Sequence, residues 1–187
     1  MNNLLILGAG GHGRVVAEAA ELQGTWENIA FLDDRSDLEV VLGHRIIGMM
    51  DEYEKFLGKY KHATACIGDN EKRLELIQKL LKVGYKVPVI IHPRAAVSKY
   101  CNIGQGTVIL AGAVINTDAS IGTGCIINIG SCVDHDCIIS DGVHICSGAV
   151  ARSACRIGGL SYIGARALVK PGVILQEKFI LSDGTVI

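Results

Sequence analysis

A repeat of six residues in the second half of the chain constrains the fold more than any other sequence feature. From Val97 to Ile174 an aliphatic residue recurs at every sixth position, and twelve of the first thirteen are valine or isoleucine. The fourth residue after each of them is small or β-branched. A period of six fits neither the 3.6-residue turn of an α-helix nor the two-residue alternation of a strand. It is the signature of a parallel β-helix built from hexapeptides.

In such a β-helix each hexapeptide forms one short strand and a turn, and three hexapeptides close a triangular coil of about 18 residues. We expect the aliphatic side chains to point inward and to stack on their equivalents one coil away, because no coil can bury a core alone. The small residue fits the crowded corner, and the frequent glycines accept the turn dihedrals. The thirteen hexapeptides predict a little over four coils.

The first ninety residues read as an α/β unit that begins with a glycine-rich loop. The apolar run Asn3–Leu7 predicts a strand, the sequence Gly8-Ala-Gly-Gly-His-Gly13 follows, and a helical pattern continues to Leu22. A glycine-rich turn between a strand and a helix lets phosphates approach the helix N-terminus. The loop therefore predicts phosphate binding at Gly10, Gly11, His12 and Gly13. The alternative is a tight turn without a ligand, in which His12 is merely solvated.

Further elements complete this unit. A second strand, Ile29–Leu32, ends in Asp33 and Asp34, which are placed to accept ribose hydroxyls. The pattern then predicts an extended segment over Val40–Ile47, a short helix over Asp51–Leu57, a strand over His62–Ile67, a helix over Glu71–Val83 with Asn70 as N-cap, and a last strand over Val87–Ile91. This is about half of a dinucleotide fold, which suits a mononucleotide better than NAD. We expect domains at residues 1–92 and 93–187.

Composition excludes several classes of partner. The net charge is −1 and there is no basic run, which argues against binding of nucleic acid or an anionic membrane. The apolar opening Leu4–Leu7 is too short for a signal peptide or a membrane span, which predicts a cytoplasmic protein. Four of the seven cysteines occupy the small position of the repeat, and no Cys-x-x-Cys pair occurs. We expect reduced cysteines that pack like alanine or serine.

One histidine of the repeat stands between two acids, in the sequence Asp134-His135-Asp136. Its place in the hexapeptide directs the side chain outward, and a neighbouring carboxylate raises the basicity of an imidazole and fixes its tautomer. The pattern predicts a general base. The main alternative is a zinc site, but His144 is the only other histidine of the coils and lies half a coil away, on a different face. We therefore expect no metal. A thiol nucleophile among Cys132, Cys137 and Cys146 is a further alternative.

These motifs together resemble the sialic acid O-acetyltransferase/nucleotide-sugar N-acetyltransferase family. The resemblance rests on the Gly8–Gly13 loop, a Gly68-Asp-Asn turn followed by Arg73, the Ile91-His-Pro93 junction and the Asp134-His-Asp136 hexapeptide, and it covers essentially the whole chain. It implies a left-handed β-helix and a homotrimer with active sites between neighbouring β-helices. It also implies that acetyl-CoA lies along the outside of the coils and that the α/β unit holds a nucleotide-sugar.

The resemblance also assigns residues. It implies His135 as catalytic base and Asp136 as the acid that orients it, with His144, Ser153 and Ile163 at the acetyl-CoA. It implies nucleotide-sugar contacts for the following residues: Gly10, Gly11, His12, Gly13, Asp33 and Asp34. Two departures stand out, because the chain ends at Ile187 without the family's coenzyme-binding tail, and Arg152-Ser-Ala154 replaces a glycine-containing corner.

The expected function is therefore transfer of an acetyl group from acetyl-CoA to the amine of a nucleotide-linked 4-amino-4,6-dideoxy sugar. His135 would remove the proton in a direct attack within a ternary complex, and His144 or a backbone N–H would stabilise the oxyanion. Two alternatives stay open: O-acetylation of sialic acid or another sugar, and a non-catalytic trimeric scaffold that binds nucleotide-sugars. A nicotinamide dehydrogenase is disfavoured because no second half-fold follows the first.

Overall fold

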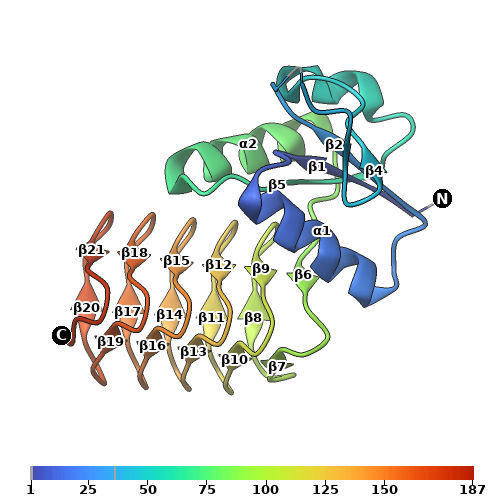
Figure 1. The fold of residues 1–187 in the computed structure, drawn as a ribbon. Coiled ribbons are helices and arrows are strands. Elements are labelled where there is room, and N and C mark those ends of the chain that lie inside the picture. The colour runs from blue at the N-terminus through green and yellow to red at the C-terminus, as the bar shows by residue number, and fades with distance from the viewer. Residues whose placement is uncertain (1, 36) are drawn as a thin grey trace.

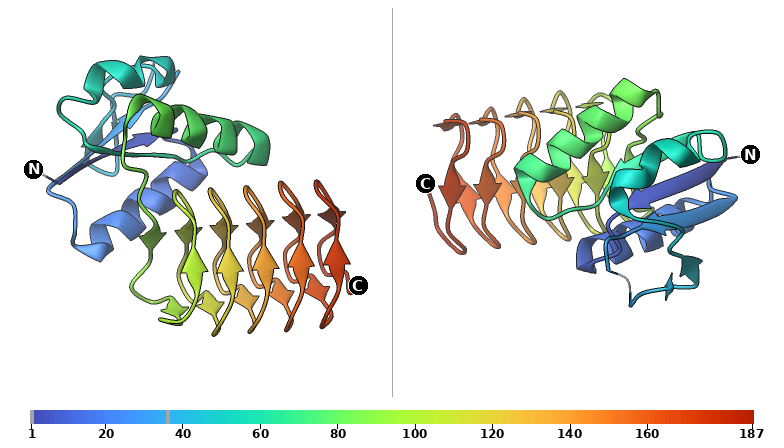
Figure 2. Two further views of the ribbon diagram at one scale, coloured as in Figure 1. Left: turned by 180° about the vertical axis from the view of Figure 1, so that it is seen from behind. Right: turned by 90° about the horizontal axis from the view of Figure 1, so that it is seen from above.

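The computed structural model describes residues 2–35 and 37–187. An α/β region comes first, and a stack of triangular coils follows it (Figure 1). The two parts lie side by side, with helix α2 extending along the coils (Figure 2). This arrangement confirms the predicted order of an α/β unit followed by a parallel β-helix.

The α/β region contains a parallel sheet of three strands in the order β2-β1-β5. The strands are β1 (Asn3–Leu7), β2 (Asn28–Leu32) and β5 (His62–Ala65), and the helices are α1 (Gly11–Gln23) and α2 (Asn70–Val83). β1 is fully buried, so its continuous apolar sequence reflects its central position in the sheet. The predicted strands and helices in this part are confirmed within a few residues.

Two short elements are more specific than predicted, and one local prediction was wrong. The short helix after the second strand is a 3₁₀ helix, η1 (Met50–Phe56), and the extended segment before it is a hairpin of β3 (Val40–Val41) and β4 (His44–Arg45). The N-cap of α2 is Asp69 instead of Asn70, because the Asp69 carboxylate accepts a hydrogen bond from the Lys72 N–H at 2.9 Å.

The predicted last strand of the α/β unit belongs to the β-helix. The structure has a strand only at β6 (Ile90–Ile91), which pairs in parallel with β9 (Val108–Ile109) and not with β5. The side chain of Ile90 is buried among residues of β1 and α1, whereas that of Ile91 packs against the interior of the coils. The first strand of the β-helix therefore lies before residue 93.

The coils form three parallel sheets that make the sides of a triangular prism. The six-stranded sheet contains β6, β9, β12 (Ile126–Ile127), β15 (His144–Ile145), β18 (Tyr162–Ile163) and β21 (Ile180–Leu181). One five-stranded sheet contains β7 (Ala96–Val97), β10 (Val114–Ile115), β13 (Cys132–Val133), β16 (Val150–Ala151) and β19 (Leu168–Val169). The other contains β8 (Asn102–Ile103), β11 (Ser120–Ile121), β14 (Ile138–Ile139), β17 (Arg156–Ile157) and β20 (Ile174–Leu175).

The β-helix is longer than the predicted length of a little over four coils, because the hexapeptide phase continues on both sides of Val97–Ile174. Ile91 precedes that stretch in phase, and Leu181 follows it in phase. The inward direction of the aliphatic position is confirmed, since Ile109, Ile127 and Ile145 are fully buried in one cluster. The small position is buried as well, and Cys125, Cys137 and Cys155 occupy it without solvent exposure.

Helix α2 packs against one corner of the prism, and glycine makes this contact possible. Gly106 and Gly124 have φ angles of 69° and 66°, which favour glycine. A Cβ atom on either residue would also lie within 2.9 Å of the Ile77 side chain of α2. The conformation of these corners and the close approach of the helix thus favour the same residue type, and together they hold α2 beside the six-stranded sheet.

Candidate active site

The glycine-rich loop connects β1 to α1 at the edge of the α/β region that faces the β-helix. Gly8 has a φ of 99°, and its N–H donates to the Leu32 carbonyl at 2.8 Å. A Cβ on Gly13 would lie 1.9 Å from the Gly8 carbonyl oxygen, so only glycine allows α1 to approach β1 so closely. Gly10 is the N-cap of α1 and supplies no side-chain cap, which leaves the first N–H groups of the helix for a ligand.

The two acids after β2 are already bonded within the protein. Asp33 accepts the Ala9 N–H at 2.7 Å and the Arg35 Nε–H at 2.7 Å. The bond from the Arg35 side chain is the main reason why the pKa of Asp33 is lowered to about 2. Asp34 accepts the Met50 N–H at 2.9 Å. The structure therefore places Asp33 beside the glycine loop as predicted and shows that it anchors the loop.

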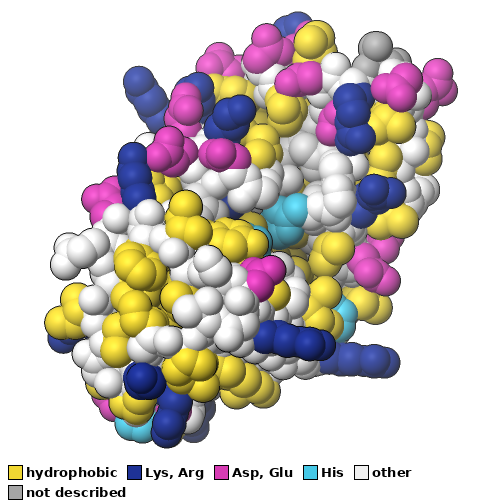
Figure 3. Space-filling model, turned by 60° about the vertical axis from the view of Figure 1, so that its left-hand side comes forward, with side chains coloured by type: hydrophobic (Ala, Val, Ile, Leu, Met, Phe, Trp, Pro, Cys, Tyr) yellow, Lys and Arg dark blue, Asp and Glu magenta, His cyan; other side chains and the backbone are white. Residues whose placement is uncertain are grey.

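Two adjoining hollows form a cleft between the α/β region and the six-stranded sheet. One, of about 290 Å³, is lined by the glycine loop together with Asp33 and Arg35. The other, of about 250 Å³, lies between α1 and the coils and reaches Asn128 and His144. Both are lined by Gly11, His12 and Gly68. Together they have the size of an ordinary small-molecule site. Figure 3 shows histidine exposed in the hollow between the two parts of the molecule.

His12 and His144 contribute two unpartnered nitrogen atoms to this cleft. The Nε2 of His12 and the Nδ1 of His144 are buried, and neither has a hydrogen-bond partner in the described part of the chain. Burial, followed by the charge of Arg73, lowers the pKa of His12 to about 3 and that of His144 to about 4. Both imidazoles are therefore neutral near pH 7. Buried polar atoms normally have partners, so a water or a ligand is needed to satisfy these two nitrogens.

Asn128 determines which nitrogen of His144 carries the proton. The Asn128 Oδ1 accepts the Ile129 N–H at 2.8 Å, so its amide NH₂ group faces the His144 Nε2 at 3.0 Å and donates to it. The Nε2 atom is therefore the acceptor, and the hydrogen of the neutral ring is on Nδ1. His144 thus has a buried N–H donor without a partner in the described part of the chain.

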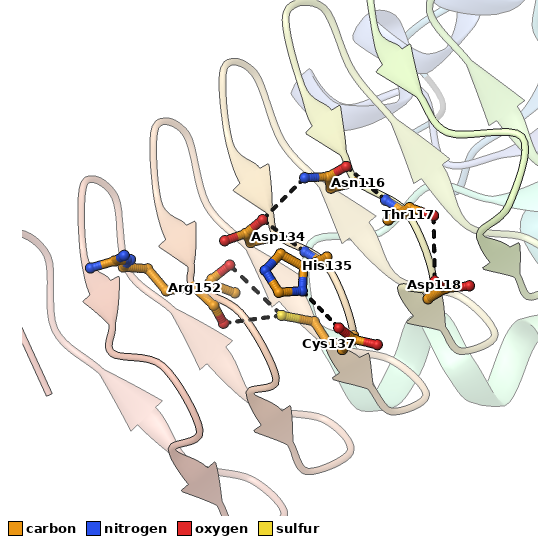
Figure 4. A network of polar contacts seen from close by, with 9 residues as sticks. Asn116, Thr117, Asp118, Asp134, His135, Cys137 and Arg152 are labelled. Atoms are coloured by element: carbon orange, nitrogen blue, oxygen red, sulfur yellow. Dashed lines mark hydrogen bonds and ion pairs between the residues drawn. The ribbon is translucent and has the colours of Figure 1, made fainter.

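His135 lies elsewhere, at the corner that joins β13 to β14 (Figure 4). Its Nδ1 is 2.7 Å from the Asp136 Oδ2, and this bond is the main cause of a raised His135 pKa. Asp136 has a φ of 60°, a conformation that aspartate tolerates better than most residues. Asp134 accepts the His135 backbone N–H at 2.8 Å and is itself held by Asn116. The Nε2 of His135 remains available to accept a proton.

The corners one coil before and after His135 stack on it. Thr117 and Ser153 occupy the equivalent positions, because β13 pairs with β10 on one side and with β16 on the other. The Ala154 N–H donates to the His135 carbonyl at 3.0 Å, and Ala154 has a φ of 59°, so this corner forms without glycine. Ser153 is partly exposed beside His135.

The side chain of Ile163 is fully buried in the interior of the coils, where the hexapeptide phase places it. The predicted coenzyme contact at Ile163 stays a prediction, and only the backbone of this residue could make it. All seven cysteines are free thiols in the structure. Burial raises the pKa of Cys137 to about 11 and also raises that of Cys146, which makes both poor nucleophiles. In residues 2–35 and 37–187 no cluster of His, Cys, Asp or Glu could hold a metal ion.

Within one chain the structure brings some predicted residues together and separates others. Gly11, His12 and His144 share one cleft at the six-stranded sheet. His135 lies at the corner where the two five-stranded sheets meet, opposite that sheet. His144 thus sits with the glycine-rich loop and not with His135. Asn128 was not predicted as the partner of His144, and Arg73 was noted in the sequence without a role.

Comparison with known proteins identifies the family. Residues 3–80 match the family described as the PglD N-terminal domain. The UDP-N-acetylbacillosamine N-acetyltransferase of Bacillus subtilis (strain 168) is 33% identical over 123 residues, which are 59% of this chain and 52% of that protein. The chain thus spans about half the length of this curated relative.

Two solved structures cover the whole chain. The acetyltransferase domain of PglB from Neisseria gonorrhoeae FA1090 has a TM-score of 0.96 and 38% identity over 100% of this chain and 91% of that chain, and it is also known in complex with acetyl coenzyme A. PerB from Caulobacter crescentus, in complex with CoA and GDP-perosamine, has a TM-score of 0.93 and 32% identity over 100% of this chain and 89% of that chain.

The chain belongs to the family of nucleotide-sugar N-acetyltransferases. The predicted family and the predicted left-handed β-helix are thereby confirmed. In the described residues of this family member, no helix has both the length and the apolar character needed to span a membrane.

Proposed function

We propose that this protein transfers the acetyl group of acetyl-CoA to the amine of a nucleotide-linked 4-amino-4,6-dideoxy sugar, with His135 as general base. The observation that carries the proposal is the His135–Asp136 pair. Asp136 engages Nδ1 at 2.7 Å, which fixes the tautomer that leaves the outward Nε2 free to take a proton.

The cleft supports a nucleotide-sugar as the acceptor. The uncapped N-terminus of α1 favours phosphate, and the neutral rings of His12 and His144 offer polar atoms that lack a protein partner. A sugar linked through a diphosphate would place its phosphates at the loop and its hydroxyls or amine toward the histidines. The relatives of known structure include one with GDP-perosamine bound, which is a nucleotide-linked amino sugar.

The separation of His135 from the cleft within one chain supports an oligomer. His135 lies opposite the six-stranded sheet that forms the cleft, so one chain cannot bring its own base to its own cleft. A ring of copies related by rotation would place the His135 corner of one copy at the cleft of the next, because a heterologous interface joins two different surface patches. We propose a homotrimer with an active site at each interface.

The chemistry then needs no covalent enzyme intermediate. The sugar amine attacks the thioester carbonyl carbon, a new C–N bond forms, and the C–S bond breaks. His135 takes the proton from the amine nitrogen and returns it to the departing CoA sulfur. Asp136 stabilises the imidazolium that exists between these two transfers. Alignment of both substrates in one cleft supplies much of the rate enhancement.

The proposal is tested by measuring CoA release with a thiol reagent. Acetyl-CoA is supplied with UDP-, dTDP- and GDP-linked 4-amino sugars, their 4-hydroxy analogues and free sialic acid. We expect turnover on one amino-sugar nucleotide and a loss of about 10²- to 10⁴-fold in kcat/KM in His135→Ala, the usual contribution of a general base. His44→Ala, a substitution in the distant hairpin, is the matched control and should retain activity.

Each other outcome rejects part of the proposal. Turnover confined to sialic acid or to a 4-hydroxy analogue would replace N-acetylation with O-acetylation. Absence of turnover on every acceptor would favour a scaffold that binds nucleotide-sugars without acyl transfer. Full activity of His135→Ala would exclude the proposed base.

A further inference from the structure

Arg73 is a buried arginine without an acidic partner. It lies on α2, has no solvent exposure and is the largest of the fully buried side chains. None of the ion pairs in residues 2–35 and 37–187 involves it. The acid that influences it is Asp69, whose carboxylate is the N-cap of α2 and accepts the Lys72 N–H. A buried charge lowers stability unless it is paired. A buried charge without an ion pair at this position therefore indicates a role other than stabilising the fold.

The guanidinium bonds almost entirely to backbone carbonyls, and these come from both parts of the molecule. Its Nη1 donates to the carbonyls of Ile67 at 3.0 Å and Gly68 at 3.2 Å, in the loop after β5. Its Nε donates to Gly124 at 2.8 Å and its Nη2 to Gly142 at 2.9 Å, in two successive corners of the β-helix. Arg73 therefore connects the α/β region to the coils at one point.

This connection lies directly behind the wall of the cleft. Gly68, whose carbonyl Arg73 holds, lines both hollows of the cleft. Carbonyl dipoles solvate the guanidinium but do not neutralise it, and burial lowers the pKa of Arg73 only to about 10. The side chain therefore stays charged at neutral pH. The cleft has a fixed positive charge close to its surface, although no cationic atom of Arg73 is accessible to a ligand.

The two histidines of the cleft respond to this charge. After burial, the positive charge of Arg73 is the next cause of the lowered pKa of both His12 and His144. The other groups that interact with Arg73 are the thiols of Cys66 and Cys125, whose pKa values burial raises. Both thiols are therefore neutral, so Asp69 is the one acid in the described residues that acts on Arg73, and it forms no ion pair with the guanidinium.

We propose that Arg73 is a positioning residue for an anionic ligand: it joins the Ile67–Gly68 loop to the β-helix, and its charge, which has no ion-pair partner in the described residues, lies behind the cleft wall and attracts the diphosphate of the nucleotide-sugar. The inference rests on the proposed function for the identity of the ligand. A neutral side chain of similar length could fill the same volume, but it would give the cleft no attraction for phosphate.

The test compares Arg73→Met, which removes the charge, with Arg73→Lys, which retains it, and uses Lys72→Met as the matched control on the exposed side of α2. Binding of inorganic pyrophosphate, UDP, GDP and their nucleosides is measured by calorimetry. We expect Arg73→Met to weaken binding of pyrophosphate and of the preferred nucleoside diphosphate about tenfold, because a nearby unit charge contributes on this scale. Nucleoside affinity should remain within about twofold, and Lys72→Met should behave like the unmodified protein.

NMR titration of the imidazoles distinguishes an electrostatic role of Arg73 from a purely structural one. A purely structural role would leave the pKa values of His12 and His144 unchanged. In the unmodified protein and in Arg73→Lys, His12 and His144 should remain neutral at pH 6. In Arg73→Met both should titrate at higher pH than in the unmodified protein. A folded Arg73→Met with unchanged pyrophosphate affinity and unchanged histidine titration overturns the proposal.

If Arg73→Met does not fold, the other proteins decide the question. Titration of His12 and His144 near pH 6.5 in the unmodified protein, or in a folded Arg73→Lys, equally overturns the proposal. Failure of the proposed function would look different, because acetyl transfer would be absent while pyrophosphate binding and the histidine titrations persisted.

Discussion

The environment of His135 is created by the residue that follows it. Asp136 adopts the left-handed conformation that glycine holds at many other corners, with φ values of 60° for Asp136 and 66° for Gly124. Glycine at position 136 would adopt this φ without strain, but it would leave the His135 Nδ1 without its carboxylate partner. Aspartate at position 136 is explained if its carboxylate orients His135 as the base and raises the His135 pKa.

The pH profile of Asp136→Asn tests this arrangement. His135 must be neutral to accept a proton, so activity falls as the pH drops below its pKa. Asparagine removes the charge that raises this pKa, and the acid limb of kcat/KM should therefore move to lower pH while the plateau falls. Asp118→Asn, in the equivalent corner one coil earlier, should move the limb less, because Asp118 acts on His135 only at longer range. An unmoved acid limb in Asp136→Asn would show that His135 is not the titrating base.

His12 and His144 should make the fold sensitive to acid. Their folded-state pKa values are about 3 and about 4, and an unfolded histidine titrates near 6.5. Below pH 6.5 the unfolded chain therefore binds protons that the folded chain does not, and stability is lost as the pH falls toward 4. Between pH 7 and pH 5 we expect a loss of about 1–2 kcal/mol per histidine.

Urea unfolding at both pH values measures this loss, with His144→Gln for comparison. Glutamine does not titrate, so the variant should lose only about half as much stability over the same interval. Equal losses in the two proteins would mean that His144 is protonated in the folded state at pH 5.

At the scale of elements, the contact between β1 and α1 depends on Gly13. Alanine at this position would place Cβ 1.9 Å from the Gly8 carbonyl, which is backbone and cannot rotate away. We expect Gly13→Ala to lower the free energy of unfolding by about 1–3 kcal/mol, the usual cost of overpacking. Gly11→Ala is the matched control, since a Cβ on Gly11 would meet no other atom within 4 Å. It should change stability by at most about 1 kcal/mol, in the stabilising direction. Equal unfolding curves for the two variants would contradict the packing argument.

The hexapeptide phase predicted the β-helix because every coil repeats the same local demand for an inward aliphatic residue. The same phase identifies Ile163 as a residue with an interior side chain, so the predicted contact with the coenzyme can involve only its backbone. The strand at Ile90–Ile91 was harder to place, because its apolar sequence suits either sheet and only its partner at Val108–Ile109 decides. Pairing over this distance does not follow from a local pattern.

The candidate site was predictable in its chemistry but not in its assembly. The acids beside His135 and the glycines before α1 are neighbours in sequence, so local reasoning found them. The contact of His144 with Asn128 joins adjacent coils, and the bonds of Arg73 join a helix to corners at Gly124 and Gly142. These relations depend on where the α/β region packs on the prism, and no short motif encodes that position.

At the scale of the whole molecule, the proposed active site requires two copies of the chain. The cleft opens at the six-stranded sheet, and His135 lies at the opposite corner of the prism. Each copy would supply its base to one neighbour and receive a base from the other. Mutations in the base and in the cleft should therefore complement each other in a mixed oligomer.

The most direct measurement is acetyl transfer by oligomers reassembled from two inactive variants, His135→Ala and the double variant His12→Ala/His144→Ala. In a 1:1 mixture, about one quarter of the interfaces should join an intact His135 to an intact cleft if the subunits combine at random. We predict recovery of about a quarter of the unmodified activity per site, although each variant alone is inactive. Absence of activity in verified mixed oligomers would contradict the shared site, because a base and a cleft that work within one chain cannot be complemented by another.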